Sequence, residues 1–125
     1  MDKPSILVVD DELLIRDLLY DFFTSQGWDI AVAENGEKAL EVLRARKFDL
    51  LLTDIKMPQM DGLTLTSRVK ESFPQLPVVL MTGYPSVETA VTALRAKAFD
   101  YVIKPFNLNQ LFKLVEKALD GDAKS

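Results

Sequence analysis

Four short polar motifs stand where apolar runs of this sequence end, and their side chains could act together on a phosphoryl group. The motifs are Asp10-Asp11, Asp54, Thr82 and Lys104. Carboxylates attract cations and can act as nucleophiles, whereas hydroxyl and ammonium groups donate hydrogen bonds to anionic oxygens. An apolar strand that ends in such a residue would deliver it to the edge of a sheet, where α/β proteins bind their ligands.

Three acids would face one lysine if these motifs meet. Two like charges about 4 Å apart repel by roughly 4 kcal/mol at an effective dielectric constant near 20. Such a cluster either raises the pKa of one carboxylate or binds a cation. Because the chain contains neither His nor Cys, the ligands would be oxygen atoms, which suit Mg²⁺. A phosphoryl oxygen could complete its coordination.

The same residues fit a phosphoryl transfer. Asp54 is the predicted nucleophile, and it needs no general base because a carboxylate is ionised at pH 7. Lys104 would pair with one phosphoryl oxygen, and the Thr82 hydroxyl would donate to another. Mg²⁺ would neutralise charge on the group in transit.

The composition excludes several other functions. A chain of 125 residues with 48% apolar residues predicts a single domain, over residues 1–119, with a polar tail or linker start at 120–125. The net charge of −4 disfavours binding to nucleic acid or to anionic lipid. The lack of His and Cys excludes ordinary zinc sites, Ser-His and Cys-His nucleophile pairs and a phosphohistidine carrier. No apolar run predicts a membrane span or a secretory signal, and a cytoplasmic location is expected.

Strands and helices alternate along the predicted fold. Apolar runs predict strands at residues 6–9, 28–33, 50–54, 77–81 and 101–103. Helical spacing predicts helices from residue 13 to Gly27 and over residues 36–47, 63–73 and 86–98, with a last helix after Asn107. Asp11, Ser86 and Asn107 are the candidate N-caps, and Gly27 the candidate C-terminal signal. This alternation predicts a parallel sheet with helices on both faces.

The strand order decides whether the polar motifs meet. The second strand is polar and carries no reactive residue at its end, which favours the flavodoxin-like order 2-1-3-4-5 with that strand at an edge. The dinucleotide-binding order is disfavoured because the first turn reads Asp-Asp-Glu in place of Gly-x-Gly-x-x-Gly. In the favoured order the other four strands are contiguous, so their carboxyl ends converge on one crevice.

With its motifs taken in order, the chain resembles the receiver domain of bacterial two-component response regulators over residues 5–119. The matching motifs are Asp10-Asp11, Asp54 with Met57-Pro58-x-Met60-Asp61-Gly62, Thr82-Gly83 and Lys104-Pro105-Phe106. Residues 82–91 further resemble receivers attached to AAA+ transcriptional activators. The resemblance implies that Asp54 is phosphorylated by a histidine kinase or a phosphotransfer protein.

The resemblance also implies roles for individual residues. The carboxylates of Asp11 and Asp54 and the main-chain carbonyl of Lys56 would ligate Mg²⁺, for which Mn²⁺ can substitute, while Asp10 acts through water. Thr82 and Tyr101 would relay phosphorylation to the surface formed by the fourth helix, fifth strand and fifth helix, where a homodimer is expected.

The resemblance further implies that Lys56 and Tyr84, each two residues after a site residue, line the approach of hydrolytic water and set the lifetime of the phosphoryl group. The chain departs from the family at Lys97, where receivers usually have glycine in the turn before the last strand. A positive φ at that position would cost lysine about 1 kcal/mol relative to glycine.

Three alternatives remain open. An aspartyl-phosphate hydrolase of the haloacid-dehalogenase kind would need a second Asp two residues after Asp10, where this chain has Glu12. A flavodoxin-like cofactor carrier would need a phosphate loop rich in hydroxyl groups and glycine after the first strand. A pseudo-receiver that acts only by protein contact would not need the complete acidic set.

Overall fold

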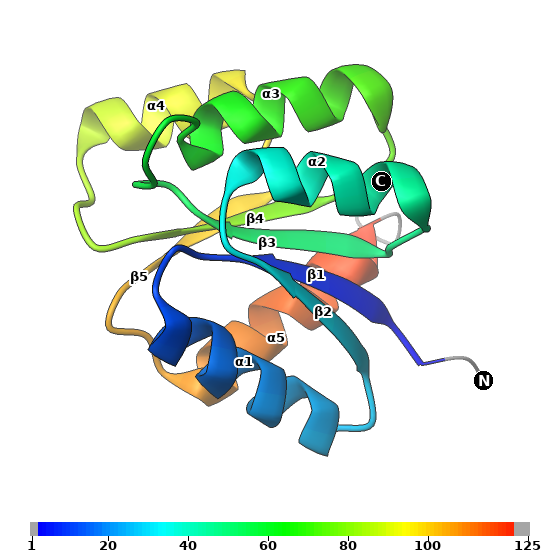
Figure 1. Cartoon of the computed structure of the whole chain (residues 1–125). Helices are drawn as coiled ribbons and strands as arrows, with labels where there is room; N and C mark the ends of the chain where they lie inside the picture. Colours follow the sequence, from blue (N-terminus) through cyan, green and yellow to red (C-terminus); the bar gives the residue numbers. More distant parts are fainter. Residues whose placement is uncertain (1–2, 122–125) are drawn as a thin grey trace.

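The protein is a five-stranded parallel sheet with helices on both faces. The computed structural model describes residues 3–121. The strands are β1 (Ser5–Val9), β2 (Asp29–Ala33), β3 (Leu50–Asp54), β4 (Val78–Thr82) and β5 (Asp100–Ile103). They pair in the order β2-β1-β3-β4-β5 (Figure 1), which confirms the flavodoxin-like order. Polar residues 120–125 were expected as a tail; of these, Asp120 caps the last helix, and residues 122–125 lie outside the described residues.

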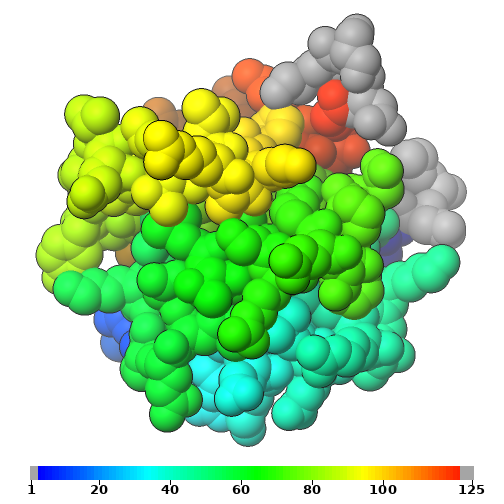
Figure 2. Space-filling model, turned by 90° about the horizontal axis from the view of Figure 1, so that it is seen from above, coloured from blue at the N-terminus to red at the C-terminus, as the bar shows by residue number. Residues whose placement is uncertain are grey.

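Five helices form the two outer layers. They are α1 (Leu13–Ser25), α2 (Gly36–Ala45), α3 (Gly62–Ser72), α4 (Val87–Arg95) and α5 (Leu108–Leu119). Helices α1 and α5 cover one face of the sheet, and α2, α3 and α4 cover the other (Figure 1). Figure 2 looks onto the second face, where α2, α3 and α4 lie side by side. No helix in residues 3–121 has the length and apolar character needed to cross a membrane.

Strand burial follows the order of the sheet. Every residue of β3 and β4 is buried, as expected for central strands covered on both faces. Val32 of β2 is 40% exposed, and Asp100 and Ile103 of β5 are also exposed, because these two strands form the edges. The prediction that the second strand is an edge strand is confirmed.

The sheet separates two apolar clusters because successive side chains of a strand point to opposite faces. On the α1–α5 face, Phe23 stacks on Trp28 with ring centroids 5.3 Å apart, and Phe112 of α5 lies 4.9 Å from Trp28. The other cluster joins strand residues to helix residues, such as Leu51 to Leu65. Both clusters extend along the central strands and hold their carboxyl ends in register.

The helix ends agree with the sequence at two N-caps and differ from it at α1, α2 and α4. The Ser86 and Asn107 side chains accept hydrogen bonds from the first turns of α4 and α5, which confirms both caps. Gly27 adopts φ 87° just after α1. The prediction that Asp11 caps α1 is wrong: Glu12 is the N-cap residue and makes no side-chain cap, while the Asp10 carboxylate accepts from the Glu12 amide at 2.9 Å. Two predicted helix ends also lie too late, since α2 and α4 end at Ala45 and Arg95.

Lys97 adopts a left-handed backbone conformation in the turn between α4 and β5. Its φ is 69°, in the region that favours glycine because a Cβ crowds the following carbonyl. The positive φ considered for this position is therefore present, and a lysine occupies it.

Candidate functional site

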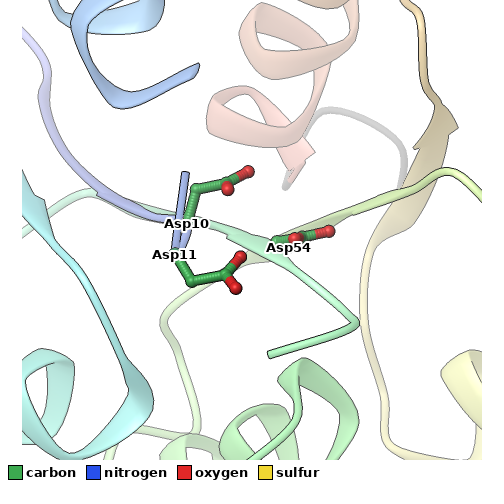
Figure 3. A group of neighbouring side chains, drawn as sticks. All are labelled: Asp10, Asp11 and Asp54. Atoms are coloured by element: carbon green, nitrogen blue, oxygen red, sulfur yellow. The ribbon is translucent and has the colours of Figure 1, made fainter. Parts of the chain in front are cut away.

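Three carboxylates meet at the carboxyl edge of the sheet. Asp10 follows β1 directly and Asp54 ends β3, so the pairing of β1 with β3 places them side by side. Asp11 adds a third acid, and one carboxylate oxygen of each lies within 4.8 Å of the others. Their side chains extend toward the same side of the sheet edge (Figure 3). Asp10 is fully buried and Asp54 is 6% exposed, whereas Asp11 is exposed.

Lys104 brings the balancing positive charge from the other side of the crevice. It follows β5, and its amide donates to the Thr82 carbonyl at 2.7 Å. Its ammonium nitrogen lies 2.8 Å from Asp10 Oδ2 and 3.4 Å from Asp54 Oδ1. A third acid, Glu12, lies 3.6 Å away. Lys104 therefore meets the acids that follow β1 and β3, and its main chain joins them to Thr82 at the end of β4.

Asp10 has both of its carboxylate oxygens engaged within the described chain. Oδ2 accepts from Lys104, and Oδ1 accepts from the Glu12 amide at 2.9 Å. Arg16 of α1 holds the main chain at the same place, since its guanidinium donates to the Asp10 carbonyl at 2.8 Å. Sequence reasoning missed Arg16; the available signal is that Arg16 is the only cation of α1 and stands six residues after the acid.

The loop after β3 fits closely against Asp54. A Cβ built on Gly62 would lie 2.1 Å from the Asp54 carbonyl oxygen, so only glycine allows this approach. The Gly62 amide donates to the Ile55 carbonyl at 2.7 Å, and Asp61 caps α3 by accepting from Thr64 at 2.8 Å. Asp61 and Gly62 thus form the turn at which α3 begins. This loop fixes both Asp54 and the chain that follows it.

Lys56 and Tyr84 contact each other at the mouth of the crevice. The Lys56 ammonium lies 4.7 Å from the centre of the Tyr84 ring, in a cation–π arrangement. The Thr82 hydroxyl, 4% exposed as a residue, accepts from the Tyr84 amide at 3.0 Å. Lys56 and Tyr84 line a pocket of about 390 Å³, which is also lined by Asp11, Asp54 and Lys104.

Tyr101 does not reach this pocket. It is half-buried on β5 and packs against the apolar cluster beneath α2, α3 and α4. In the sheet it pairs with Leu80 of β4, two residues before Thr82. A relay between Thr82 and Tyr101 stays a prediction.

Comparison with known proteins decides the family. Residues 6–116 match the model of the response regulator receiver domain. The chain belongs to this family. This receiver is 44% identical over 118 residues to the transcriptional regulatory protein ZraR of Escherichia coli O157:H7, covering 94% of the chain and 27% of ZraR. It thus spans about a quarter of the length of that relative. The relatives ZraR, AtoC and NtrC confirm the predicted resemblance to receivers of AAA+ transcriptional activators.

Solved receiver structures have the same fold. A CheY-like receiver protein from Methanospirillum hungatei JF-1 superimposes with a TM-score of 0.93 at 31% identity, covering 98% of each chain. The response regulator TrrA of Thermotoga maritima, solved in complex with Mg²⁺-BeF, has a TM-score of 0.84 at 36% identity, covering 92% of this chain and 98% of TrrA. Family membership removes the support for the hydrolase and for the flavin carrier.

The surroundings of Asp54 disfavour its ionised form. Burial, followed by the negative charge of Asp10, raises the pKa of Asp54 from 3.8 to about 6, although Lys104 and the Ile55 amide act in the opposite direction. Burial alone would lower the pKa of Lys104, but its hydrogen bond to Asp10 and the charges of Asp10 and Asp54 raise it above the ordinary value. The site is thus short of positive charge at neutral pH.

We expect Asp54→Asn to stabilise the metal-free protein at pH 7. A carboxyl group whose pKa is higher in the folded than in the unfolded state loses stability as pH rises from 3.8 to about 6. Removing the charge should raise the free energy of unfolding by about 1 to 2 kcal/mol at pH 7, with little gain near pH 4. Urea unfolding without divalent ions at both pH values measures this, and destabilisation at pH 7 would contradict it.

Proposed function

We propose that this receiver accepts a phosphoryl group on Asp54 from the phosphohistidine of a sensor histidine kinase or a phosphotransfer protein. The observation that carries this proposal is the convergence of Asp10, Asp11 and Asp54 within 4.8 Å, with Lys104 3.4 Å from the carboxylate of Asp54. The domain acts as a signalling switch that assists its own phosphorylation and dephosphorylation, and it is not a turnover enzyme. The complete acidic set disfavours a pseudo-receiver.

The transfer makes one bond and breaks one. A carboxylate oxygen of Asp54 attacks phosphorus, the P–N bond of the phosphohistidine breaks, and the departing imidazole takes a proton from solvent. Lys104 is placed to pair with a phosphoryl oxygen, since its ammonium already lies beside Asp54. Within residues 3–121 the Thr82 hydroxyl accepts a hydrogen bond but donates none, which leaves its proton for a phosphoryl oxygen.

The donor set fits a hard divalent cation. Asp11 and Asp54 would supply carboxylate oxygens and Lys56 its main-chain carbonyl, while Asp10 acts through water because Lys104 and the Glu12 amide already occupy its oxygens. Mg²⁺, or Mn²⁺ in its place, would neutralise charge on the transferred group. The complex of TrrA with Mg²⁺-BeF supports this choice of metal.

The output surface is the face formed by α4, β5 and α5, with Thr82 and Tyr101 as the relay. Four exposed apolar residues lie on α4 and β5, namely Val87, Val91, Leu94 and Ile103. A homodimer that covers this face after phosphorylation would transmit the signal, because a few kcal/mol of differential binding shifts a two-state equilibrium. In this proposal residues 1–119 form a cytoplasmic domain that touches neither nucleic acid nor membrane, and residues 120–125 begin a linker to a transcriptional or other output.

Asp54→Asn should abolish phosphorylation. The wild-type chain is expected to gain the mass of one phosphoryl group on incubation with a small phosphodonor and Mg²⁺, as measured by intact mass spectrometry. Asp21→Asn, an exposed acid of α1, is the matched control and should label like wild type. A single-site mass gain that persists in Asp54→Asn would refute the assignment of the phosphoacceptor.

Tyr84→Ala should shorten the lifetime of the phosphorylated form. The Tyr84 ring and the Lys56 ammonium stand together at the pocket mouth, so removing the ring opens a path for hydrolytic water. We expect dephosphorylation to accelerate several-fold, measured from the decay of the phosphorylated mass after removal of the donor. Tyr20→Ala removes another exposed tyrosine, on α1, and should leave the rate unchanged. Equal decay of all three proteins would reject the role of Tyr84.

A further inference from the structure

A second pocket lies at the opposite end of the sheet from the phosphoacceptor. It has a volume of about 770 Å³ and is bordered by the segments that lead into β1, β3, β4 and β5 and by the end of α5. The amino ends of these strands face away from the loops that carry Asp10 and Asp54 (Figure 1). We call it the basal pocket; its lining residues include Lys3, Asp49, Lys70, Lys97, Phe99 and Leu119.

Three lysines face the basal pocket without an ion pair. Among residues 3–121, neither Lys3 nor Lys70 nor Lys97 lies within salt-bridge distance of a carboxylate. The carboxylate that lines the pocket, Asp49, accepts instead from the Ser5 amide at 2.8 Å. Among residues 3–121 the pocket lining therefore carries three positive charges and one negative charge, in a chain whose net charge is −4.

Lys70 is the one of the three whose ammonium makes a hydrogen bond within residues 3–121. Its side chain is half-buried, and its ammonium donates to the Leu76 carbonyl at 2.5 Å. An ammonium carries three donors, so two remain for a ligand. The carbonyl fixes the position of the charge, which lowers the entropy that Lys70 would lose on binding.

Lys97 is unfavourable for two reasons, its backbone conformation and its charge beside Lys70. Its φ of 69° favours glycine, and its charge adds to burial in lowering the pKa of Lys70. Strained, like-charged groups of this kind are found where a ligand offsets their cost. An anion placed between Lys70 and Lys97 would remove their repulsion.

We propose that the basal pocket binds an organic polyphosphate. Lysine is a common phosphate-binding residue, and three ammonium groups match a group that carries two or more negative charges. The walls around them include Pro4, Pro77, Phe99 and Leu119, which suit an apolar or aromatic body attached to the phosphates. The volume is within the range of small-molecule sites. This site is separate from the proposed phosphoryl transfer at Asp54 and does not depend on it.

The test is an NMR titration of the protein with ATP and, separately, with pyrophosphate, both without divalent ions. We expect saturable shifts of the amides of Lys70, Lys97, Phe99 and Gly121, with tighter binding of ATP than of pyrophosphate. Shifts at Asp11 and Asp54 would instead report binding at the phosphoacceptor edge, so the outcome at each end of the sheet is recorded separately.

Lys97→Gly is the decisive variant, because glycine suits φ 69° and the fold should be retained. The affinity for ATP should fall about tenfold or more, a change of about 1.4 kcal/mol, while Lys97→Arg keeps it. Lys113→Gln, which removes an exposed charge of α5 outside the pocket, is the control and should bind like wild type.

Three results would overturn the proposal. They are the absence of saturable shifts in the basal pocket, an equal loss of affinity in Lys97→Gly and Lys113→Gln, and pyrophosphate binding as tight as that of ATP. The second would show diffuse attraction to surface charge, and the third would show that the apolar walls take no part.

Discussion

The interaction on which this structure depends is the contact of one ammonium group with two buried carboxylates. Lys104 lies 2.8 Å from Asp10 and 3.4 Å from Asp54, at a sheet edge where both acids are almost removed from water. Burying charges is costly, and one cation does not offset the repulsion of two acids. The pKa of Asp54 is raised because its burial and the repulsion of Asp10 outweigh the attraction of Lys104. An added divalent cation or a phosphoryl group that engages Lys104 would change the balance, which is what a switch requires.

The rest of the fold holds these charged groups in fixed positions. The central strands β1, β3 and β4 are buried on both faces, so Asp10, Asp54 and Thr82 rest on the most rigid part of the molecule. The close approach of Gly62 to the Asp54 carbonyl fixes the loop that carries Lys56. Arg16 fixes the chain at Asp10 from the other side. Rigid support of this kind keeps the reacting groups in position without further reorganisation.

Much of this could be predicted from the sequence because the governing patterns are local. Apolar runs that stop at Asp10, Asp54, Thr82 and Lys104 gave both the strands and the residues at their ends, and the polar second strand gave the order of the sheet. The cap of α1 was predicted wrongly, because the two adjacent acids Asp10 and Asp11 are equally good candidates by residue type and the Asp10 carboxylate is the one that accepts from the Glu12 amide. Contacts between distant segments could not be predicted either. The cation–π pair of Lys56 and Tyr84 and the grouping of Lys3, Lys70 and Lys97 at the basal pocket depend on tertiary packing, which residue spacing does not show.

The central claim is that Asp11 and Asp54 gather around a single divalent ion. Isothermal titration of the unphosphorylated chain with Mg²⁺, compared with Asp11→Asn and with the matched surface variant Asp17→Asn, tests it most directly. The account predicts one ion per chain, retained in Asp17→Asn and lost or greatly weakened in Asp11→Asn. Saturable binding of equal strength in all three proteins, or none in the wild type, would contradict it.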